Sequence, residues 1–576
     1  MYILGINAYH GDSAACLLKD GVVVCATEEE RFRRIKHWAG FPKEAIKFCL
    51  QDQGISIDQV DYITISRNPK ANFYKKLAYV FSNPSQFSFV LDRLINTNRI
   101  NSIQDELSSL FNISSSLLKS KIFNIEHHRS HIASSFFASP FKHAAILSID
   151  GFGDFTSTMT AVGNGNQFDV LGEINYPHSL GVFYTTLTQF LGFSNYGDEY
   201  KVMGLAPYGK PVFIKDLEKL LLTKNGFFKL NRSYFRHFKE GINMNWKEGK
   251  PVVGINFSDS LVDLIGKPRK KDDSIEQWHI DLACSVQKIT EDVIFYILNS
   301  LHKKTGLDNL CMTGGVAQNS VVNGKILART PFKNIYIPSA ANDSGTSIGS
   351  ALYLYNHILR KPRCEAIKSA SFGKEYSEEY VRSLLDEKGI LYKMLSDKEL
   401  FNIVVDKLLD AGVVGWFQGR AEFGSRALGN RSILVDPRRA DAKDLLNKKI
   451  KRRETFRPFA PSILKEYISE YFLQEDNAYF MEKVFEIKEE KRDKIPAVTH
   501  VDGTGRLHSV DSSISPRYYQ LIRTFYNRTD VPILLNTSFN ENEPIVNSPE
   551  EAIECFLRTK MDLLVIGNII IERSND

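Results

Sequence analysis

The sequence predicts an α/β protein of several domains, with an internal repeat in its N-terminal part. A strand-and-turn pattern occurs twice, near the N-terminus and again from residue 144, and strand-then-helix units follow further along the chain. The length of 576 residues exceeds what one ordinary hydrophobic core spans, so we expect roughly two to four domains.

The first copy of the pattern is the stretch "YILGINAYHGDSAACLLKDGVVVCATEEE". Apolar runs separated by Gly11 with Asp12, and then by a Lys-Asp-Gly turn, predict consecutive strands. A similar arrangement returns in "AAILSIDGFGDFTSTMTAVGNG", with an apolar strand, a Gly and Asp loop, a Thr-rich strand and a Gly-Asn-Gly turn. The two stretches are alike in pattern more than in identity, which indicates a loose internal repeat.

Segments with apolar residues at helical spacing follow both copies. The stretches "FPKEAIKFCLQDQG" and "DLACSVQKITEDVIFYILNSLHKKTG" are predicted helices, and the second ends at a glycine. Two strand-then-helix units come next, "NLCMTGGVAQNSVVNGKIL" and "NIYIPSAANDSGTSIGSALYLYN". In each, a glycine-bearing loop lies between strand and helix, where backbone N–H groups and the helix dipole can receive phosphate oxygens.

The stretch "KPRCEAIKSASFGK" interrupts this pattern with proline, glycine and small residues. It marks the predicted domain boundary, which divides the chain into residues 1–362 and 363–576. The second part contains a predicted helix near 397–411, a strand "GVVGWFQG", a very basic stretch, and two late strands, "VPILLNTSF" and "DLLVIGNIIIE". This order fits a second α/β domain built on a sheet of mixed strand directions.

The composition is that of a globular protein without a strong charge bias. The 73 basic and 68 acidic residues leave a net charge of +5, which gives no reason to expect a nucleic-acid or membrane partner. Seven scattered cysteines without a C-x-x-C spacing argue against a disulfide framework or a cysteine zinc site. Because the sequence has neither a signal-type N-terminus nor an apolar run of about 18 residues, we expect a cytoplasmic protein.

Three histidines lie close together in "NIEHHRSHIASSFF". On a helix, His127 and His131 share a face and can bind one metal ion, whereas His128 points elsewhere. Alone, this pair favours a solvated helix start over a metal site. Asp150, at the end of the strand "AAILSID", and Asp343, in the loop "ANDSGTSIG", are further candidate ligands, although each alone fits an N-cap or turn residue. Together, two imidazoles and two carboxylates suit a divalent ion such as iron, manganese or zinc.

The second candidate site is the basic stretch "GRAEFGSRALGNRSILVDPRR", followed by "NKKIKRRETFRPFAPS". Guanidinium groups bind phosphate oxygens bidentately, so basic residues interleaved with Gly, Ser and Phe suit an oxyanion-rich ligand. A basic surface or a nucleic-acid patch is the alternative, but apolar residues flank nearly every charge, which favours phosphate. Asn536 and Ser538 in "LLNTSFN", and Arg506 in "VDGTGRLHSV", can add hydrogen bonds or serve ordinary strand and turn roles.

Taken together, these motifs resemble the carbamoyltransferases that act on nodulation factors and on aminoglycosides such as tobramycin. The resemblance rests on the two strand-turn repeats, the HHxxH and Asp150 elements, and segments in family order: "EYKVMGLAPYG", "TGGVAQN", "NDSGTSIGSAL", "EFGSRALGNRSILVDPR", "FRPFAPS" and "LNTSFN". It implies an N-terminal duplicated domain of the actin, sugar-kinase and Hsp70 type (Kae1-like), followed by a C-terminal YrdC-like α/β domain.

The same resemblance implies an ATP-dependent O-carbamoyltransferase. Such enzymes make carbamoyl-adenylate from carbamoyl phosphate and ATP in the C-terminal domain, and transfer the carbamoyl group in the N-terminal domain to a hydroxyl of a small-molecule acceptor, here a natural product or a sugar. Neither a membrane nor a nucleic acid is then an expected partner, and a homodimer is one option for the assembly. The alternatives are a tRNA threonylcarbamoyl-adenosine-type modification enzyme and a non-catalytic nucleotide-binding regulator.

The resemblance also implies roles for individual residues. A metal site whose usual occupant is iron(II) falls on His127, His131, Asp150 and Asp343. Nucleotide contacts fall on Lys36, Gly314, Gly315 and Asn319, and contacts to carbamoyl phosphate and ATP fall on Arg426, Lys451, Arg457, Arg506, Asn536 and Ser538. The expected catalytic residues are His10, Asp12 and Lys36, with His10 or Asp12 as the general base, because their turn should face the same cleft.

The chain departs from the family pattern at two turns. Where members often have His-Asp-Ala-Ser, this chain has His10-Gly11-Asp12-Ser13, and where they have Phe-Gly-Pro-Arg it has Ser425 before Arg426. The region from about 211 to 275 matches no family motif, and we expect acceptor specificity to reside there.

Overall fold

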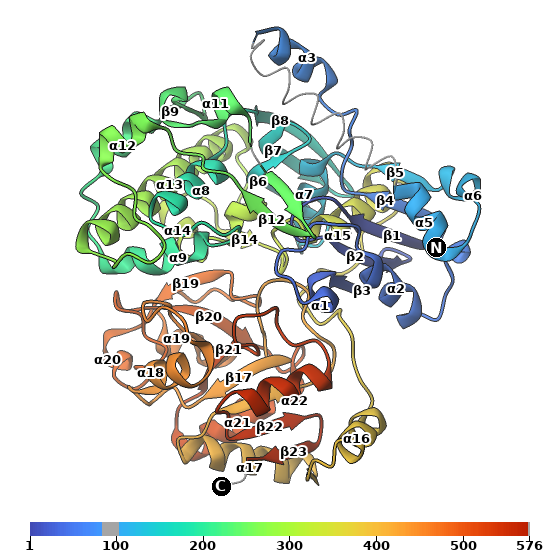
Figure 1. Cartoon of the computed structure of the whole chain (residues 1–576), viewed down its shortest axis with the longest axis vertical. Helices are drawn as coiled ribbons and strands as arrows, with labels where there is room; N and C mark the ends of the chain where they lie inside the picture. Colours follow the sequence, from blue (N-terminus) through green and yellow to red (C-terminus); the bar gives the residue numbers. More distant parts are fainter. Residues whose placement is uncertain (83–102, 243, 574–576) are drawn as a thin grey trace. The chain divides into compact units, whose positions relative to one another are not determined.

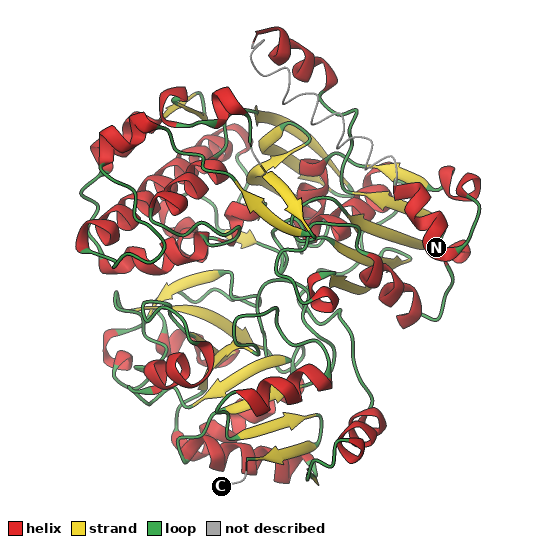
Figure 2. Cartoon of the chain, in the orientation of Figure 1, coloured by secondary structure: helices red, strands yellow, loops and turns green. Residues whose placement is uncertain are grey.

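The computed structural model describes residues 1–82, 103–242 and 244–573 (Figure 1). The chain forms two compact units: unit 1 is Met1–Val322 with Ile326–Ile367, and unit 2 is Asn323–Lys325 with Lys368–Asp576. The main separation follows Ile367, whereas the sequence predicted a boundary after residue 362. Both units combine helices and strands (Figure 2), so the predicted α/β class is confirmed.

The first sheet of unit 1 begins with the predicted meander. It consists of β1 (Tyr2–Asn7), β2 (Ala14–Lys19), β3 (Val22–Glu28), β4 (Tyr62–Ile65) and β5 (Ile122–Asn124), in the order β3-β2-β1-β4-β5. The first three strands pair antiparallel, while β4 and β5 continue the sheet in parallel to β1. The apolar run of β1 is buried, as its composition predicts.

The second sheet of unit 1 repeats this plan. It consists of β6 (His143–Gly153), β7 (Thr156–Asn164), β8 (Gln167–Asn175), β13 (Asn309–Thr313) and β14 (Asn334–Tyr336), in the order β14-β13-β6-β7-β8. Here too three strands form an antiparallel meander, and two later strands extend it in parallel to the first. The internal repeat and the duplicated N-terminal domain are therefore confirmed.

Two equivalent helices join the halves of unit 1. Helix α7 (His127–Phe136) follows the last strand of the first sheet, and α15 (Gly345–Leu352) follows the last strand of the second. A Cβ on Gly349 would lie 1.8 Å from the carbonyl oxygen of Ser130, so only glycine permits this close approach of α15 to α7. The packing brings the starts of both helices, which carry candidate site residues, to one place.

The other helices of unit 1 include both that the sequence predicted. They are α2 (Lys43–Asp52) and α13 (Gln277–Thr305), and α13 ends at Gly306 in a left-handed conformation, as the sequence pattern indicates. Further described helices outside the region from 211 to 275 are α1 (Glu30–Arg33), α3 (Phe73–Ser82), α5 (Ile103–Phe111), α6 (Ser115–Lys119), α8 (Leu180–Phe190), α9 (Glu199–Leu205) and α14 (Ser320–Arg329).

The region from 211 to 275 forms short elements of its own. These are α10 (Ile214–Leu217), β9 (Leu221–Lys224), β10 (Phe227–Leu230), α11 (His237–Glu240), β11 (Met244–Lys247), β12 (Lys250–Val253) and α12 (Asp259–Ile265). Its strands pair as two separate hairpins, β9 with β10 and β11 with β12, outside the two main sheets.

Unit 2 is built on one sheet of mixed strand directions, as predicted. The order β15-β23-β22-β16-β17-β21-β18-β20-β19 is formed by β15 (Lys393–Met394), β16 (Val414–Phe417), β17 (Arg431–Val435), β18 (Ala460–Leu464), β19 (Lys483–Glu486), β20 (Thr504–Val510), β21 (Ile533–Ser538), β22 (Leu563–Ile566) and β23 (Ile569–Glu572). Its helices are α16 (Glu378–Glu387), α17 (Asp397–Leu409), α18 (Ala442–Leu446), α19 (Ile468–Tyr471), α20 (Glu489–Arg492), α21 (Pro516–Thr529) and α22 (Pro549–Arg558).

One prediction for unit 2, a single strand near the end of the chain, is wrong. The stretch "DLLVIGNIIIE" forms a hairpin of β22 and β23, because the chain reverses at Gly567, whose φ of +58° suits glycine. Across the parts of the chain that the structure describes, helices with the length and apolar character needed to span a membrane are absent.

Candidate active site

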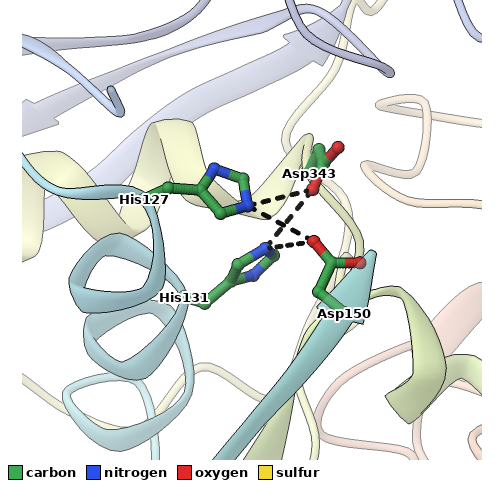
Figure 3. A group of neighbouring side chains, drawn as sticks. All are labelled: His127, His131, Asp150 and Asp343. Carbon is green, nitrogen blue, oxygen red and sulfur yellow. Dashed lines mark hydrogen bonds and ion pairs between the residues drawn. The ribbon is translucent and has the colours of Figure 1, made fainter. Parts of the chain in front are cut away.

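Four residues predicted as metal ligands converge in unit 1 (Figure 3). His127 Nε2 lies 3.3 Å from Asp150 Oδ2 and 3.5 Å from Asp343 Oδ1. His131 Nε2 lies 3.4 Å and 3.3 Å from the same two oxygens. We call these four residues the His–Asp cluster. All four are buried, so the alternative of a solvated helix start, which the histidine pair alone would favour, is wrong.

The local fold of α7 explains why two of the three histidines face the cluster. Glu126 caps the helix by accepting a hydrogen bond from the Arg129 amide, and the spacing of four places His127 and His131 on one face. His128 points elsewhere, as predicted: its ring nitrogens lie 2.7 Å from Ser148 Oγ and 3.0 Å from the Thr156 carbonyl oxygen.

Asp150 lies within a strand and not at its end. The prediction of a strand end is wrong because β6 continues to Gly153, with a shift in pairing register between Ile149 and Gly153. This bulge turns the Asp150 side chain toward the cluster. The Gly315 amide donates to Asp150 Oδ1 at 3.0 Å, which leaves Oδ2 facing the two histidines.

Asp343 lies in the loop before α15, as predicted. Its Oδ1 faces the histidines, while its Oδ2 lies 2.5 Å from His10 Nδ1. The other nitrogen of His10, Nε2, lies 3.2 Å from the carbonyl oxygen of Phe152. The predicted catalytic residue His10 is therefore brought directly against a member of the His–Asp cluster.

Negative charge is concentrated in this cluster. Burial alone would raise the pKa of Asp150, but the hydrogen bond of His127 and the charge of His131 hold that pKa well below its usual value. Burial would also raise the pKa of Asp343, but the charge and hydrogen bond of His10 outweigh it and lower that pKa to about 2. Both carboxylates are therefore ionised, which suits a divalent cation.

The donor atoms of the cluster also fit a metal ion in their spacing. Ligand bonds of about 2.1 Å place neighbouring donors roughly 3.0 to 3.4 Å apart in octahedral or tetrahedral geometry. The separations between the cluster's nitrogens and oxygens are 3.3 to 3.5 Å. His131 Nε2 and Asp343 Oδ1 are buried without a hydrogen-bond partner, and an ion at the centre would satisfy both.

A second polar group lies beside the cluster and includes residues that the sequence analysis missed. It contains Asp12, Glu30 and His37, with His37 Nδ1 at 2.7 Å from Asp12 Oδ1. Asn342 donates to the other Asp12 oxygen at 2.7 Å. His37 directly follows the predicted nucleotide residue Lys36, but a lone histidine in a basic run carries no signal of its own.

The residues predicted to contact the nucleotide differ in their surroundings. Gly314 has a φ of +95° and lies so close to Ile149 that a Cβ would be 2.2 Å from its carbonyl oxygen. The Asn319 side chain caps α14 and pairs with Gln287, which are structural contacts. Lys36 is exposed. Gly315 is joined directly to the His–Asp cluster through its bond to Asp150.

In unit 2, three arginines lie within electrostatic reach of Arg506. The pKa of Arg506 falls well below the usual arginine value because the group is buried and because Arg426, Arg453 and Arg457 repel its charge. Its Nε is buried without a hydrogen-bond partner. We call Arg426, Arg453, Arg457 and Arg506 the arginine cluster. Arg453 was missed by the sequence analysis, although it lies in the quoted basic run.

The other predicted residues of unit 2 form two local groups. Lys451 is buried, and its Nζ donates to the Ser538 carbonyl oxygen at 2.5 Å and to Asn540 Oδ1 at 2.7 Å. Asn536 donates through Nδ2 to the carbonyl oxygen of Ala427, the residue after Arg426, at 3.2 Å. Lys451 therefore fixes the end of β21, and Asn536 fixes the loop that carries one cluster arginine.

Comparisons with known proteins identify the family of the chain. Residues 2–352 match the family model described as the carbamoyltransferase N-terminus, and residues 405–573 match the one described as the carbamoyltransferase C-terminus. Each model covers most of one unit, and together they include every predicted site residue.

Several relatives match over most of their length. The uncharacterized protein sll1178 of Synechocystis sp. is 41% identical over 613 aligned positions, which cover 100% of this chain and 97% of that protein. Nodulation protein NolNO of Sinorhizobium fredii is 37% identical, covering 98% of this chain and 80% of its own. Nodulation protein NolO of Bradyrhizobium diazoefficiens is 39% identical, and the match covers 78% of this chain and 79% of that protein. The chain therefore belongs to the carbamoyltransferase family and is a carbamoyltransferase enzyme.

Proposed function

We propose that the reaction proceeds through carbamoyl-adenylate, made from ATP and carbamoyl phosphate, and ends on a hydroxyl of a small natural product or sugar. The arginine cluster is the observation that carries the first step, because three arginines lie within electrostatic reach of the partly buried Arg506 guanidinium. Such a group binds an anion rich in phosphate oxygens. The similarity to nodulation proteins supports a small-molecule acceptor.

The chemistry of the first step explains the need for several cations. Water hydrolyses carbamoyl phosphate to carbamate and phosphate, and the carbamate oxygen attacks the α-phosphorus of ATP with loss of pyrophosphate. Both reactants are anions, so fixed guanidinium groups would screen their repulsion and stabilise the charge that builds up in the transition state. Asn536 and Ser538 would add neutral hydrogen bonds, and Lys451 would hold Ser538 in position.

The second step is proposed for unit 1. The His–Asp cluster would hold a divalent metal ion, for which we propose iron(II). When bound, the ion would supply Lewis-acid polarisation of the carbamoyl group. The chain's own residues orient its ligands: the Gly315 amide holds Asp150, and His10 holds Asp343. Lys36, Gly314, Gly315 and Asn319 are the proposed nucleotide contacts, and His10 or Asp12 the proposed base.

The first experiment is direct. Purified protein is mixed with ATP and carbamoyl phosphate, and pyrophosphate and carbamoyl-AMP are measured by enzyme-coupled assay and mass spectrometry. We expect both products, and neither when carbamoyl phosphate is omitted. A protein that binds ATP but forms neither product contradicts the proposed route. Activity when threonine and bicarbonate replace carbamoyl phosphate would instead support a threonylcarbamoyl enzyme.

The acceptor is sought separately. Extracts of the source cells are incubated with the protein, ATP and carbamoyl phosphate, and compared by mass spectrometry with extracts that received heat-inactivated protein. A compound that gains one carbamoyl group only in the active sample identifies the acceptor. If such compounds retain a free hydroxyl and gain the group on nitrogen, the proposed O-transfer is wrong.

A further inference from the structure

His10 is held on both of its ring nitrogens. Its Nδ1 lies 2.5 Å from Asp343 Oδ2, and its Nε2 lies 3.2 Å from the carbonyl oxygen of Phe152. Because a carbonyl oxygen only accepts hydrogen bonds, Nε2 must carry the proton, and its lone pair is not available. His10 therefore orients Asp343 and is not placed to take a proton from an alcohol.

Asp12 is held in a different way. His37 Nδ1 lies 2.7 Å from Asp12 Oδ1, and Asn342 Nδ2 donates to Asp12 Oδ2 at 2.7 Å. Asn342 directly precedes Asp343, so one loop fixes this carboxylate and also supplies a member of the His–Asp cluster. Each carboxylate oxygen of Asp12 keeps a further lone pair. Asp12 is thus a fixed acceptor beside the proposed transfer centre.

The Asp12–His37 pair is more accessible than the two imidazoles of the His–Asp cluster. The side chains of His127 and His131 are 1% and 0% exposed. Those of Asp12 and His37 are 12% and 33% exposed. An incoming hydroxyl group can therefore approach the pair from solvent, which the buried imidazoles of the cluster do not allow.

Tyr196 packs against the pair and lies within electrostatic reach of the cluster carboxylates. Its ring packs edge-on against His37 with the ring centroids 5.3 Å apart. Its hydroxyl lies so close to Gly11 that a Cβ there would be 2.3 Å from the oxygen. Burial, and then the charges of Asp12 and of the cluster carboxylates, raise the pKa of Tyr196 well above its usual value. The phenol therefore stays protonated as a hydrogen-bond donor in the field of both groups.

The loop that carries His37 also packs against the hairpin of β11 and β12. The Ala39 amide donates to the carbonyl oxygen of Gly249 at 2.9 Å, and a Cβ on Gly249 would lie 2.1 Å from a ring carbon of Trp38. This hairpin belongs to the region in which we expect acceptor specificity. Contacts thus lead from the His–Asp cluster, through the pair, to the expected acceptor region.

Both members of the pair have a backbone conformation that non-glycine residues rarely adopt. The φ angle is +55° at Asp12 and +57° at His37, in the left-handed region. Such conformations persist where the surrounding contacts enforce them, and they are enriched at functional sites. The strain at both residues agrees with a pair whose geometry is functional.

We propose that Asp12 is the general base that takes the proton of the acceptor hydroxyl, and that His37 is a positioning residue that holds its carboxylate. The acceptor oxygen bonds to the carbamoyl carbon of carbamoyl-adenylate while its proton moves to Asp12. The bond between that carbon and the phosphate oxygen breaks, and AMP leaves with the electron pair. Asp12 then returns its proton to solvent. This inference rests on the proposed function, which supplies the adenylate.

The test uses the full chain with ATP and carbamoyl phosphate, and with water or glycerol as the probe nucleophile. Pyrophosphate in the first turnover reports adenylate formation, and AMP release reports attack on the adenylate. For Asp12→Asn we expect an unchanged pyrophosphate burst and AMP release slowed by roughly 100-fold or more, the usual size of a general-base effect. Thermal unfolding of each variant checks that unit 1 is folded.

Two substitutions at His37 separate positioning from a structural role. His37→Asn keeps an N–H donor for Asp12, so AMP release should stay within about threefold of wild type. His37→Phe keeps the ring but not the donor, so AMP release should fall by about tenfold and its acid limb should move to higher pH. The other charged groups acting on His37 are Glu30, Lys36 and Glu199, and they are the same in both variants.

The possible outcomes test the base assignment of Asp12, the positioning role of His37 and the proposed function separately. Normal AMP release by Asp12→Asn overturns the base assignment, and so does a wild-type protein that makes carbamoyl-adenylate but releases no AMP to either nucleophile. If His37→Asn and His37→Phe slow AMP release equally and leave its pH profile unchanged, the positioning role of His37 is wrong. A wild-type protein that forms neither pyrophosphate nor carbamoyl-adenylate contradicts the proposed function instead.

Discussion

His131 Nε2 and Asp343 Oδ1 face each other at 3.3 Å in the interior of unit 1, and both atoms are buried without a hydrogen-bond partner. Leaving a buried polar atom unsatisfied costs about 1 to 3 kcal/mol. An ion bound between the two atoms would satisfy both of them. The fold around the His–Asp cluster should therefore respond to metal.

The first prediction concerns metal removal. Dialysis against a chelator should lower the unfolding temperature, and Fe²⁺ or Co²⁺ should restore it, because a ligand at 100 times its Kd stabilises the folded state by about 2.7 kcal/mol. His131→Ala should abolish this response, as measured by differential scanning fluorimetry with metal analysis. His128→Asn is the control, because His128 contacts Ser148 and Thr156 and should still permit metal binding. A normal metal response in His131→Ala would refute the site.

The second prediction separates the two proposed half-reactions. Replacing His127 and His131 together by alanine should abolish transfer to the acceptor, because it removes both imidazoles of the cluster. Carbamoyl-adenylate formation should remain within about twofold of wild type, since the arginine cluster in unit 2 is unchanged. First-turnover pyrophosphate and carbamoylated product are measured in parallel. Normal product formation by the double variant contradicts the metal assignment.

The sequence predicted the architecture well because periodicity and turn residues are local signals. The meander at the N-terminus, its repeat and the long helix α13 all follow from apolar spacing and terminal glycines. The hairpin at Gly567 was missed because a glycine between two apolar runs also fits a single buried strand.

The candidate site was only partly predictable from its residues. His127 and His131 are linked by helix geometry, but their meeting with Asp343 depends on the packing of α7 on α15, which no local pattern contains. The bulge at Asp150 and the contact of His37 with Asp12 arise from tertiary structure in the same way. The family resemblance predicted the cluster, whereas the contacts of its neighbouring residues are seen only in the folded structure.

The third prediction concerns Arg506. Replacing it by methionine should lower the rate of pyrophosphate formation by roughly 100-fold, a typical loss when one charge-stabilising donor is removed. The same change should raise the free energy of unfolding by about 1 kcal/mol, because it removes a buried charge that three arginines repel. Pyrophosphate assays and urea unfolding measure the two effects. A variant that is both active and less stable would show that Arg506 has a structural role instead.

The fourth prediction is a pH dependence of stability. Burial lowers the pKa of His37, but the charge and hydrogen bond of Asp12, together with Glu30, outweigh it and raise that pKa from 6.5 to about 9. A pKa raised by folding means that the protonated imidazole stabilises the fold fully below pH 6.5, and that this stabilisation is lost as the pH rises through about 9. The free energy of unfolding of wild type should therefore exceed that of His37→Phe by more at about pH 6 than at about pH 10. Urea unfolding at both values checks this, and a difference that grows with pH contradicts it.

The fifth prediction concerns the contact between α7 and α15 that assembles the cluster. A Cβ at Gly349 would lie 1.8 Å from the Ser130 carbonyl oxygen, so Gly349→Ala must push the two helices apart. Overpacking of this kind costs about 1 to 3 kcal/mol, and the shift should also weaken metal binding, because α7 carries the histidines and Asp343 precedes α15. Gly151→Ala is the matched control for stability, since a Cβ there meets nothing within 4 Å. Urea unfolding and metal titration of both variants measure the effect. If Gly349→Ala matches wild type in both, the close helix contact does not position the cluster.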